Sequence, residues 1–228
     1  MDGAALKDAR LASSSTQVDS ARLLGVTQAY LSMVERGTRP VSAELASRAA
    51  AVFEVPPTTL PLGTYQPVSR SELAFKQLLG ALGYPGFAYL RGNLTLNPAA
   101  LLMEALDSED LDSRVTEALP WLPLTYPKLD WDWLMRNSKL RDRQNRLAFV
   151  VSLAIQLAAQ KKDVALKAAL ESRLQKLEPS RLAAEDTLCK DSMTKAERKW
   201  LKAHRSRAAK HWNLLTDLTA EQLDYASL

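Results

Sequence analysis

The sequence has little cysteine, histidine or glycine, and each shortage excludes a class of protein. Cys189 is the one cysteine in 228 residues, so no disulfide can staple the chain and a reducing compartment is the expected setting. The two histidines, His204 and His211, have no cysteine or histidine partner at metal-ligand spacing, so we expect no metal site. No glycine-rich loop could cradle a phosphate, and Cys189 has no base near it in sequence. We therefore expect neither enzyme activity nor a cofactor.

Long hydrophobic runs are also missing. The most apolar stretch, residues 147–159, contains two polar side chains and is too short to cross a bilayer of roughly 30 Å. The first residues, Met-Asp-Gly, have neither the basic flank nor the apolar run of a signal peptide. These absences predict a cytoplasmic protein with no membrane partner.

The residues that are abundant favour helices. Alanine, leucine, lysine and glutamate are plentiful, whereas the eight glycines are too few for the turns of a fold with many short strands. Apolar residues recur at helical spacing, and no segment alternates as a strand does. We predict an all-α protein with a small helical domain at 1–62, a linker at 63–71 and a larger all-helical domain at 72–228.

Helix start and stop signals divide the N-terminal segment into four short helices and one further turn. Thr16, Thr27 and Ser42 can cap the second, third and fourth helices. Gly25 and Gly37 can end the second and third in the left-handed conformation. The expected ranges are 6–12, 16–24, 27–36, 42–53 and 58–60.

The spacing of residues in this segment is specific. It reads Gln17-(x)3-Ala21-(x)3-Gly25-Val-Thr-(x)3-Leu31-Ser-x-Val-Glu-x-Gly37, where small Ala21 permits a close helix crossing and Gly25 a tight turn. Residues 6–60, about a quarter of the chain, resemble the xenobiotic-response-element or lambda-repressor-like (Cro/C1-type) helix-turn-helix family. The resemblance implies a five-helix domain that binds double-stranded DNA and places its third helix in the major groove.

The resemblance also implies roles for individual side chains. Gln28 would read a base edge, Gln17 would touch a phosphate and steady Gln28, and Arg36 and Arg39 would reach the backbone. Arg10 and Glu35 would form a partly buried structural ion pair, since removing one partner of such a pair costs several kcal/mol. The residues expected to contact DNA are Gln17, Thr27, Gln28, Ala29, Tyr30, Ser32, Met33, Arg36, Thr38 and Arg39.

Three serines depart from the family pattern. Ser14 stands where glycine is common, Ser15 where an apolar residue is usual, and Ser20 where leucine is usual. Losing two apolar anchors should weaken the packing of the second helix by about 1–3 kcal/mol each, unless Val18 or Leu23 turns inward. Residues 1–63 hold six basic and six acidic side chains, so DNA affinity must come from a few placed groups and from duplication in a dimer.

The larger domain matches no family with conviction, and its patterns leave alternatives open. The aromatic cluster of Trp121, Tyr126, Trp131 and Trp133 fits a core seam or an interface with a partner. The basic residues Arg136, Lys139, Arg141, Arg143 and Arg146 are expected on the solvent face of a helix. The expected helices are 72–82, 98–106, 111–119, 131–161 (a pair or one broken helix), 164–177, 181–189 and 195–215.

The segment 195–215 has the strongest amphipathic pattern. Its apolar side includes Trp200, Leu201 and Trp212. Its basic side is a solvated face, or a contact to DNA phosphates, or a contact to an acidic partner such as a cognate toxin. The basic residues are Lys195, Arg198, Lys199, Lys202 and Arg205.

Three functions are compatible with these features. The first is a sequence-specific transcriptional regulator, a repressor that binds a near-palindromic operator as a homodimer. The second is an antitoxin whose helical C-terminal domain neutralises a co-encoded toxin while the DNA-binding domain represses the operon. Segments 97–102 and 118–122 are weakly similar to the helical tails of regulators encoded beside nucleotidyltransferase-type toxins. The third is a protein-binding adaptor with a degenerate helix-turn-helix.

Overall fold

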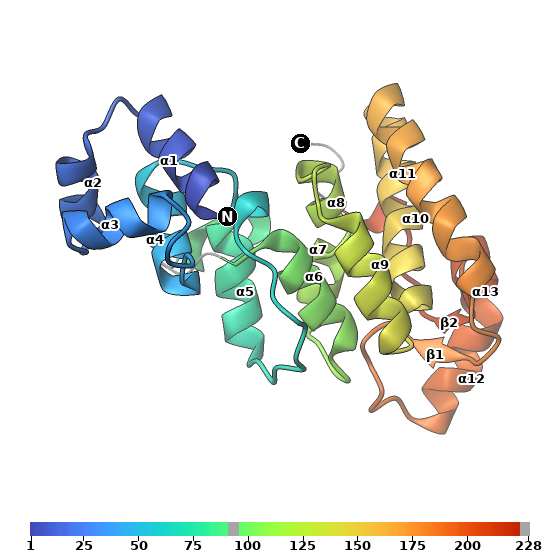
Figure 1. The fold of residues 1–228 in the computed structure, drawn as a ribbon. Helices are drawn as coiled ribbons and strands as arrows, with labels where there is room; N and C mark the ends of the chain where they lie inside the picture. The colour runs from blue at the N-terminus through green and yellow to red at the C-terminus, as the bar shows by residue number, and fades with distance from the viewer. Residues whose placement is uncertain (91–95, 224–228) are drawn as a thin grey trace.

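The computed structural model describes residues 1–90 and 96–223. A group of short N-terminal helices, here called the head (residues 1–60), lies at one end of the molecule, and a larger helical body (residues 72–223) extends from it (Figure 1). The protein is all-α, as the composition predicts. The head contains α1 (Gly3–Ala12), α2 (Gln17–Leu24), α3 (Gln28–Glu35), α4 (Ala43–Val52) and the 3₁₀ turn η1 (Pro57–Thr59).

The caps of the head are those that the sequence predicts. The hydroxyls of Thr16, Thr27 and Ser42 accept backbone N–H bonds in the first turns of α2, α3 and α4. Gly25 and Gly37 have φ of 65° and 74°, in the left-handed region that glycine adopts without steric cost. Local chemistry alone therefore defines the helix boundaries here to within a few residues.

The head has its own hydrophobic core, formed where α1, α2, α3 and α4 meet. Gly3 shows how closely α1 approaches α3, because a Cβ atom built on it would lie 1.9 Å from the Val34 carbonyl oxygen. Only glycine permits this contact without moving the helices apart. The buried core residues are Leu6, Ala21, Leu24, Leu31, Val34, Leu45 and Ala49.

The serines are accommodated differently from what we expected. Ser20 is fully buried and its hydroxyl donates to Ser15 Oγ at 2.7 Å. Val18 and Leu23 are 57% and 61% exposed, so the expectation that one of them turns inward is wrong. The inward face of α2 is already set by Ala21 and Leu24, and Val18 points away from it.

The backbone conformation at Ser14 explains why this position commonly holds glycine. Its φ is 55°, in the left-handed region, which serine adopts at some cost in free energy. Replacing Ser14 by glycine would therefore relieve backbone strain in the turn between α1 and α2.

The body is built around α10 (Gln144–Gln160), which is buried along most of its length and packs beside α11 (Val164–Leu177) (Figure 1). The segment 131–161 is a helix pair, because the chain turns between α9 and α10 at Asp142, whose φ is 56°. The remaining helices are α5 (Glu72–Ala81), α6 (Pro98–Asp107), α7 (Ser113–Ala118), α8 (Trp121–Thr125), α9 (Trp131–Leu140), α12 (Lys195–His204) and α13 (Arg207–His211), with 3₁₀ turns η2 (Pro85–Leu90), η3 (Glu178–Ser180) and η4 (Ala220–Gln222).

Two predicted helices near the C-terminal end are wrong. Residues 181–189 are an irregular, bent segment rather than a helix, and within it β1 (Asp186–Thr187) pairs in parallel with β2 (Leu214–Leu215). The segment 195–215 is not continuous, because α12 ends at His204 and α13 is followed by β2. Both strands are only two residues long, which is too short to show the alternating pattern that predicts a strand.

Arg146 is the reason that residues 186–191 are held in this path. We expected Arg146 on a solvent face, but it is fully buried in α10. It donates to both carboxylate oxygens of Asp186, to Asp191, and to the carbonyl oxygens of Leu106 and Ser108. These bonds use all five guanidinium N–H groups, so the buried charge is fully satisfied.

The other residues of that basic group lie nearer the surface. Arg141 and Arg143 both pair with Asp107, at 3.0 and 3.3 Å. Arg136 and Lys139 are exposed, as expected. The basic residues that the sequence groups together therefore include exposed side chains as well as Arg146, which is buried and bonds to distant parts of the body.

The chain between head and body lies against the body. Trp133 Nε1 donates to the Gly63 carbonyl oxygen at 2.9 Å, and the ring of Tyr65 stands edge-on to Trp133. Asn97 caps α6 and also donates to the Thr58 and Leu60 carbonyl oxygens. The last turn of the head is thus hydrogen-bonded to the start of α6.

The aromatic cluster is mostly a core seam. Trp131 and Trp133 are buried, while Trp121 is half-buried and packs edge-on against Tyr84 and Tyr126.

In the described ranges, no helix is both long and apolar enough to cross a membrane.

Candidate nucleic-acid interface

The interface is built on a buried ion pair between α1 and α3. Arg10 Nε donates to Glu35 Oε1 at 2.7 Å, and Arg10 Nη2 donates to Glu35 Oε2 at 3.0 Å. The two side chains are only 10% and 3% exposed. Arg10 Nη1 also donates to the Ser15 carbonyl oxygen, so the pair fixes the turn that leads into α2. A bidentate pair of this kind is geometrically specific as well as strong.

A chain of hydrogen bonds leads from this pair to the surface. Gln17 Nε2 donates to Glu35 Oε2 at 2.9 Å, and Gln28 Nε2 donates to Gln17 Oε1 at 2.7 Å. Gln17 is the first residue of α2 and Gln28 the first residue of α3, so the bonds tie the two helix starts together. The Gln28 amide has a second N–H and a carbonyl oxygen, which are the groups that a bidentate contact to adenine requires.

Comparison with known proteins agrees with this geometry. The family model described as "Helix-turn-helix" matches residues 6–60. Residues 6–60 form a helix-turn-helix domain. The family is one of DNA-binding transcription regulators of the Cro/C1 type, and the match covers about a quarter of the chain. No curated protein and no solved structure gave a match.

Of the ten predicted DNA-contacting residues, six are exposed and four, including Gln17, are half-buried. Thr27, Gln28 and Ala29 are exposed at the start of α3, and Tyr30, Ser32 and Met33 are half-buried farther along it. The exposed residues Arg36, Thr38 and Arg39 follow in the turn after α3.

Several of these side chains already bond within the domain. Thr27 Oγ1 accepts from the Tyr30 N–H, and Thr38 Oγ1 donates to the Met33 carbonyl oxygen. Arg36 Nε donates to the Ser32 carbonyl oxygen. The resemblance implied the Arg10–Glu35 pair and the contact of Gln17 with Gln28, but the bond from Gln17 to Glu35 that joins them appears only in the structure.

The acidity of Glu35 provides a pH test of the buried pair. Burial alone would raise the pKa of Glu35, but the hydrogen bonds from Arg10 and Gln17 outweigh it and leave the pKa below its ordinary value. A carboxylate whose pKa is lower in the folded state contributes stability at pH values above the unfolded pKa of about 4.3. That contribution is lost as the pH falls through the folded-state pKa.

We therefore expect the thermal midpoint of the helix-turn-helix domain to fall below about pH 4.3, and to fall less steeply in a Glu35→Gln variant. The measurement is circular dichroism of both proteins between pH 3 and pH 7. Other carboxylates titrate in the same range in both proteins, so the comparison isolates Glu35. Identical slopes in the two proteins would contradict the assignment.

More of the basic residues in segment 195–205 form bonds within the body than the sequence indicated. Lys202 and Arg205 pair with Glu185 at 3.1 and 3.5 Å, and Arg198 donates to the Asp191 carbonyl oxygen. Lys195 and Lys199 are exposed. Three of the five basic residues therefore bond within the body.

Trp200 does not lie on the buried side of α12, contrary to our expectation. It is 53% exposed and its ring is stacked on His204 at 4.3 Å between centroids. Leu201 and Trp212 are buried, as predicted. Trp200 and Leu201 are neighbours in α12 and lie about 100° apart around the helix, and of the two only Leu201 is buried.

Cys189 is part of the core. Its Sγ donates to the Ala105 carbonyl oxygen, and burial raises the pKa of the thiol to about 11. In the described part of the chain, no three histidine, cysteine, aspartate or glutamate side chains are grouped so that they could hold a metal ion.

Proposed function

We propose that this protein is a sequence-specific transcriptional repressor of the cytoplasm that binds its operator as a homodimer. The observation that supports this most is the hydrogen-bond chain from Arg10 through Glu35 and Gln17 to Gln28. It holds the first side chain of the recognition helix at a fixed angle before DNA is bound. A preoriented side chain loses less conformational entropy on binding, which favours base reading over nonspecific attraction.

Seven of the ten predicted contact residues have separate roles in this proposal. Gln28 reads a base edge, and Ala29 contacts a thymine methyl group. The side chains that contact the phosphate backbone are Gln17, Tyr30, Arg36, Thr38 and Arg39. Gln17, Arg36 and Thr38 also form hydrogen bonds within the domain.

The division of the chain is part of the proposal. Residues 1–62 bind DNA, residues 63–71 connect, and residues 72–228 supply the dimer contact. A head without net charge gains little affinity as a single copy, so two copies on a two-fold site are the expected unit.

Two substitutions separate base reading from backbone contact. Gln28→Ala should cost about 1–3 kcal/mol at one base step and relax the preference there. Arg39→Ala should weaken binding to all sequences alike and reduce the slope of log K against log salt by about one. Arg22→Ala, in the last turn of α2 and outside the contact set, is the control. The measurement is titration of the DNA upstream of the gene, and of random DNA, at several salt concentrations.

An equal affinity of the parent protein for upstream and random DNA would contradict the proposal that it is a sequence-specific regulator. Unchanged profiles for both variants would contradict the assignment of α3 as the recognition helix.

The antitoxin and adaptor alternatives differ in the body, and no contact in the described residues favours either. Co-purification with the product of a neighbouring gene distinguishes them, and the variant Lys195→Glu with Lys199→Glu tests whether α12 makes the contact.

A further inference from the structure

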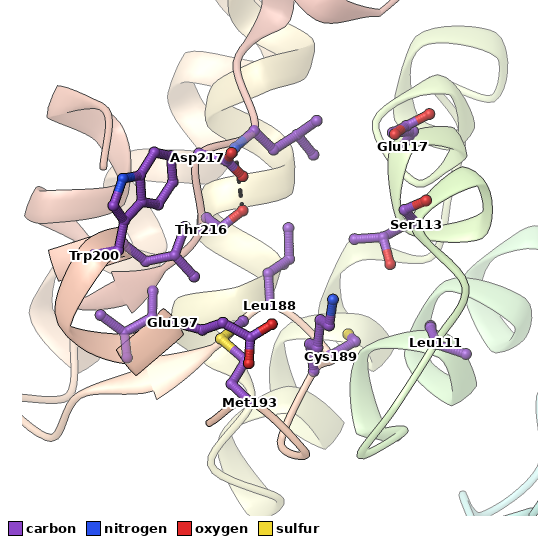
Figure 2. Close-up of a pocket in the computed structure, with 15 residues that line it drawn as sticks. Leu111, Ser113, Glu117, Leu188, Cys189, Met193, Glu197, Trp200, Thr216 and Asp217 are labelled. Carbon is purple, nitrogen blue, oxygen red and sulfur yellow. Dashed lines mark hydrogen bonds between the residues drawn. The ribbon is translucent and has the colours of Figure 1, made fainter. Parts of the chain in front are cut away.

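A cavity of about 350 Å³ opens on the surface of the body, far along the chain from the helix-turn-helix domain. Figure 2 shows Glu197, Trp200 and Asp217 on one side of it and Ser113 and Glu117 of α7 on the other, with Leu188 and Cys189 between them. Its volume is in the range of small-molecule sites. The cavity brings together three stretches of chain, 111–117, 188–201 and 215–218, so no local sequence pattern predicts it.

The cavity has an apolar floor and an aromatic edge. Leu188, Leu201 and Leu215 line it and are buried, and the flexible side chain of Met193 lines it beside them. Trp200 is the largest exposed apolar side chain on its wall. An exposed indole next to a methionine is a surface that adapts to an apolar ligand and gains free energy when covered.

The charged groups around this floor are mostly acidic. Glu117, Glu197 and Asp217 line the cavity, and Lys190 is the one basic lining residue among those described. The hydrogen bonds that Glu197 accepts from the Thr194 backbone N–H and hydroxyl lower the pKa of Glu197. Carboxylates on two opposite walls attract a cation and repel an anion, and an indole face adds a cation–π attraction.

The floor of the cavity is held in place from behind. Leu188, Cys189 and Lys190 lie between Asp186 and Asp191, and both aspartates are bonded to the buried guanidinium of Arg146. Leu111 N–H donates to the Cys189 carbonyl oxygen, which ties this stretch to the α6–α7 loop. A site anchored in this way is formed before a ligand arrives, which lowers the entropic cost of binding.

We propose that this cavity binds a small organic cation with an apolar, aromatic body. The apolar part covers the leucines and the face of Trp200, and the positive charge lies between the carboxylate of Glu117 and those of Glu197 and Asp217. The site is independent of the proposed DNA binding, so either assignment can fail without the other.

The experiment compares two ions of nearly the same shape and opposite charge. Isothermal titration calorimetry of the full chain with tetraphenylphosphonium and with tetraphenylborate should show at least about tenfold tighter binding of the cation. Asp217→Asn should weaken the cation by about threefold, as expected for one exposed carboxylate. Trp200→Leu should weaken it by about fivefold through loss of the cation–π contact.

Glu171→Gln removes an exposed carboxylate of α11 outside the cavity and should leave binding unchanged. Both cavity variants change exposed side chains, and circular dichroism verifies that they fold. Equal affinity for the two ions, no heat with the cation at 1 mM, or equal binding by all variants would overturn the proposal. So would a concentration-dependent dimer that Trp200→Leu dissociates, because the cavity would then be a contact between two copies.

Discussion

Replacing Arg146 by lysine should lower the free energy of unfolding by about 3–5 kcal/mol. Lysine keeps the charge but offers three N–H groups on one atom instead of a planar fork of five. It cannot reach both oxygens of Asp186, Asp191 and the two carbonyl oxygens of α6 and its following loop at the same time. The Leu106 carbonyl oxygen is buried, so the loss of its donor is costly because no water replaces it.

The measurement is urea unfolding followed by circular dichroism. Arg136→Lys is the matched control, since Arg136 is exposed on the neighbouring helix α9 and its replacement should change stability by less than about 0.5 kcal/mol. The pKa of Asp186 gives a second readout. Burial would raise that pKa, but the Arg146 bonds leave it below its ordinary value, and it should rise in the variant. Equal stability of the two variants would show that the guanidinium does not organise the body.

The second large effect is expected in the helix-turn-helix domain. Arg10→Met should destabilise the domain by about 3–5 kcal/mol, because it leaves the carboxylate of Glu35 buried without its partner. A domain with a core this small has little stability to spare, so the loss should unfold it while the body stays folded. Gln17 and Gln28 then lose their fixed orientation, and specific DNA binding should disappear.

Hydrogen exchange measured region by region tests this expectation. Protection should fall in α1 to α4 and remain in α10 and α11. Arg48→Met is the control, because Arg48 is 42% exposed and pairs only with Glu44, one turn away on the same helix. Unchanged protection in α1 to α4 of the Arg10 variant would show that the pair contributes little. Loss of protection throughout the chain would instead show that the Asn97 contacts make head and body one cooperative unit.

The sequence by itself determined the head. The capping threonines and serine, the left-handed glycines and the spacing from Gln17 to Gly37 act within a few residues of each other, so they can be interpreted without knowing the fold. The same local signals placed α3 and its exposed residues. They also gave the all-α class, because helix-forming residues with helical periodicity dominate the whole chain.

Only the tertiary structure decided what depends on distant partners. The sequence places Arg146 in one basic group with exposed Arg136, but Arg146 is buried because acceptors 38 to 45 residues away converge on it. Residues 181–189 were expected to be helical but form an irregular segment, since β1 within it takes its partner from residues 214–215. The bond between Gln17 and Glu35 and the cavity beside α12 arise in the same way. Such features are set by long-range packing and hydrogen bonding, which no local pattern contains.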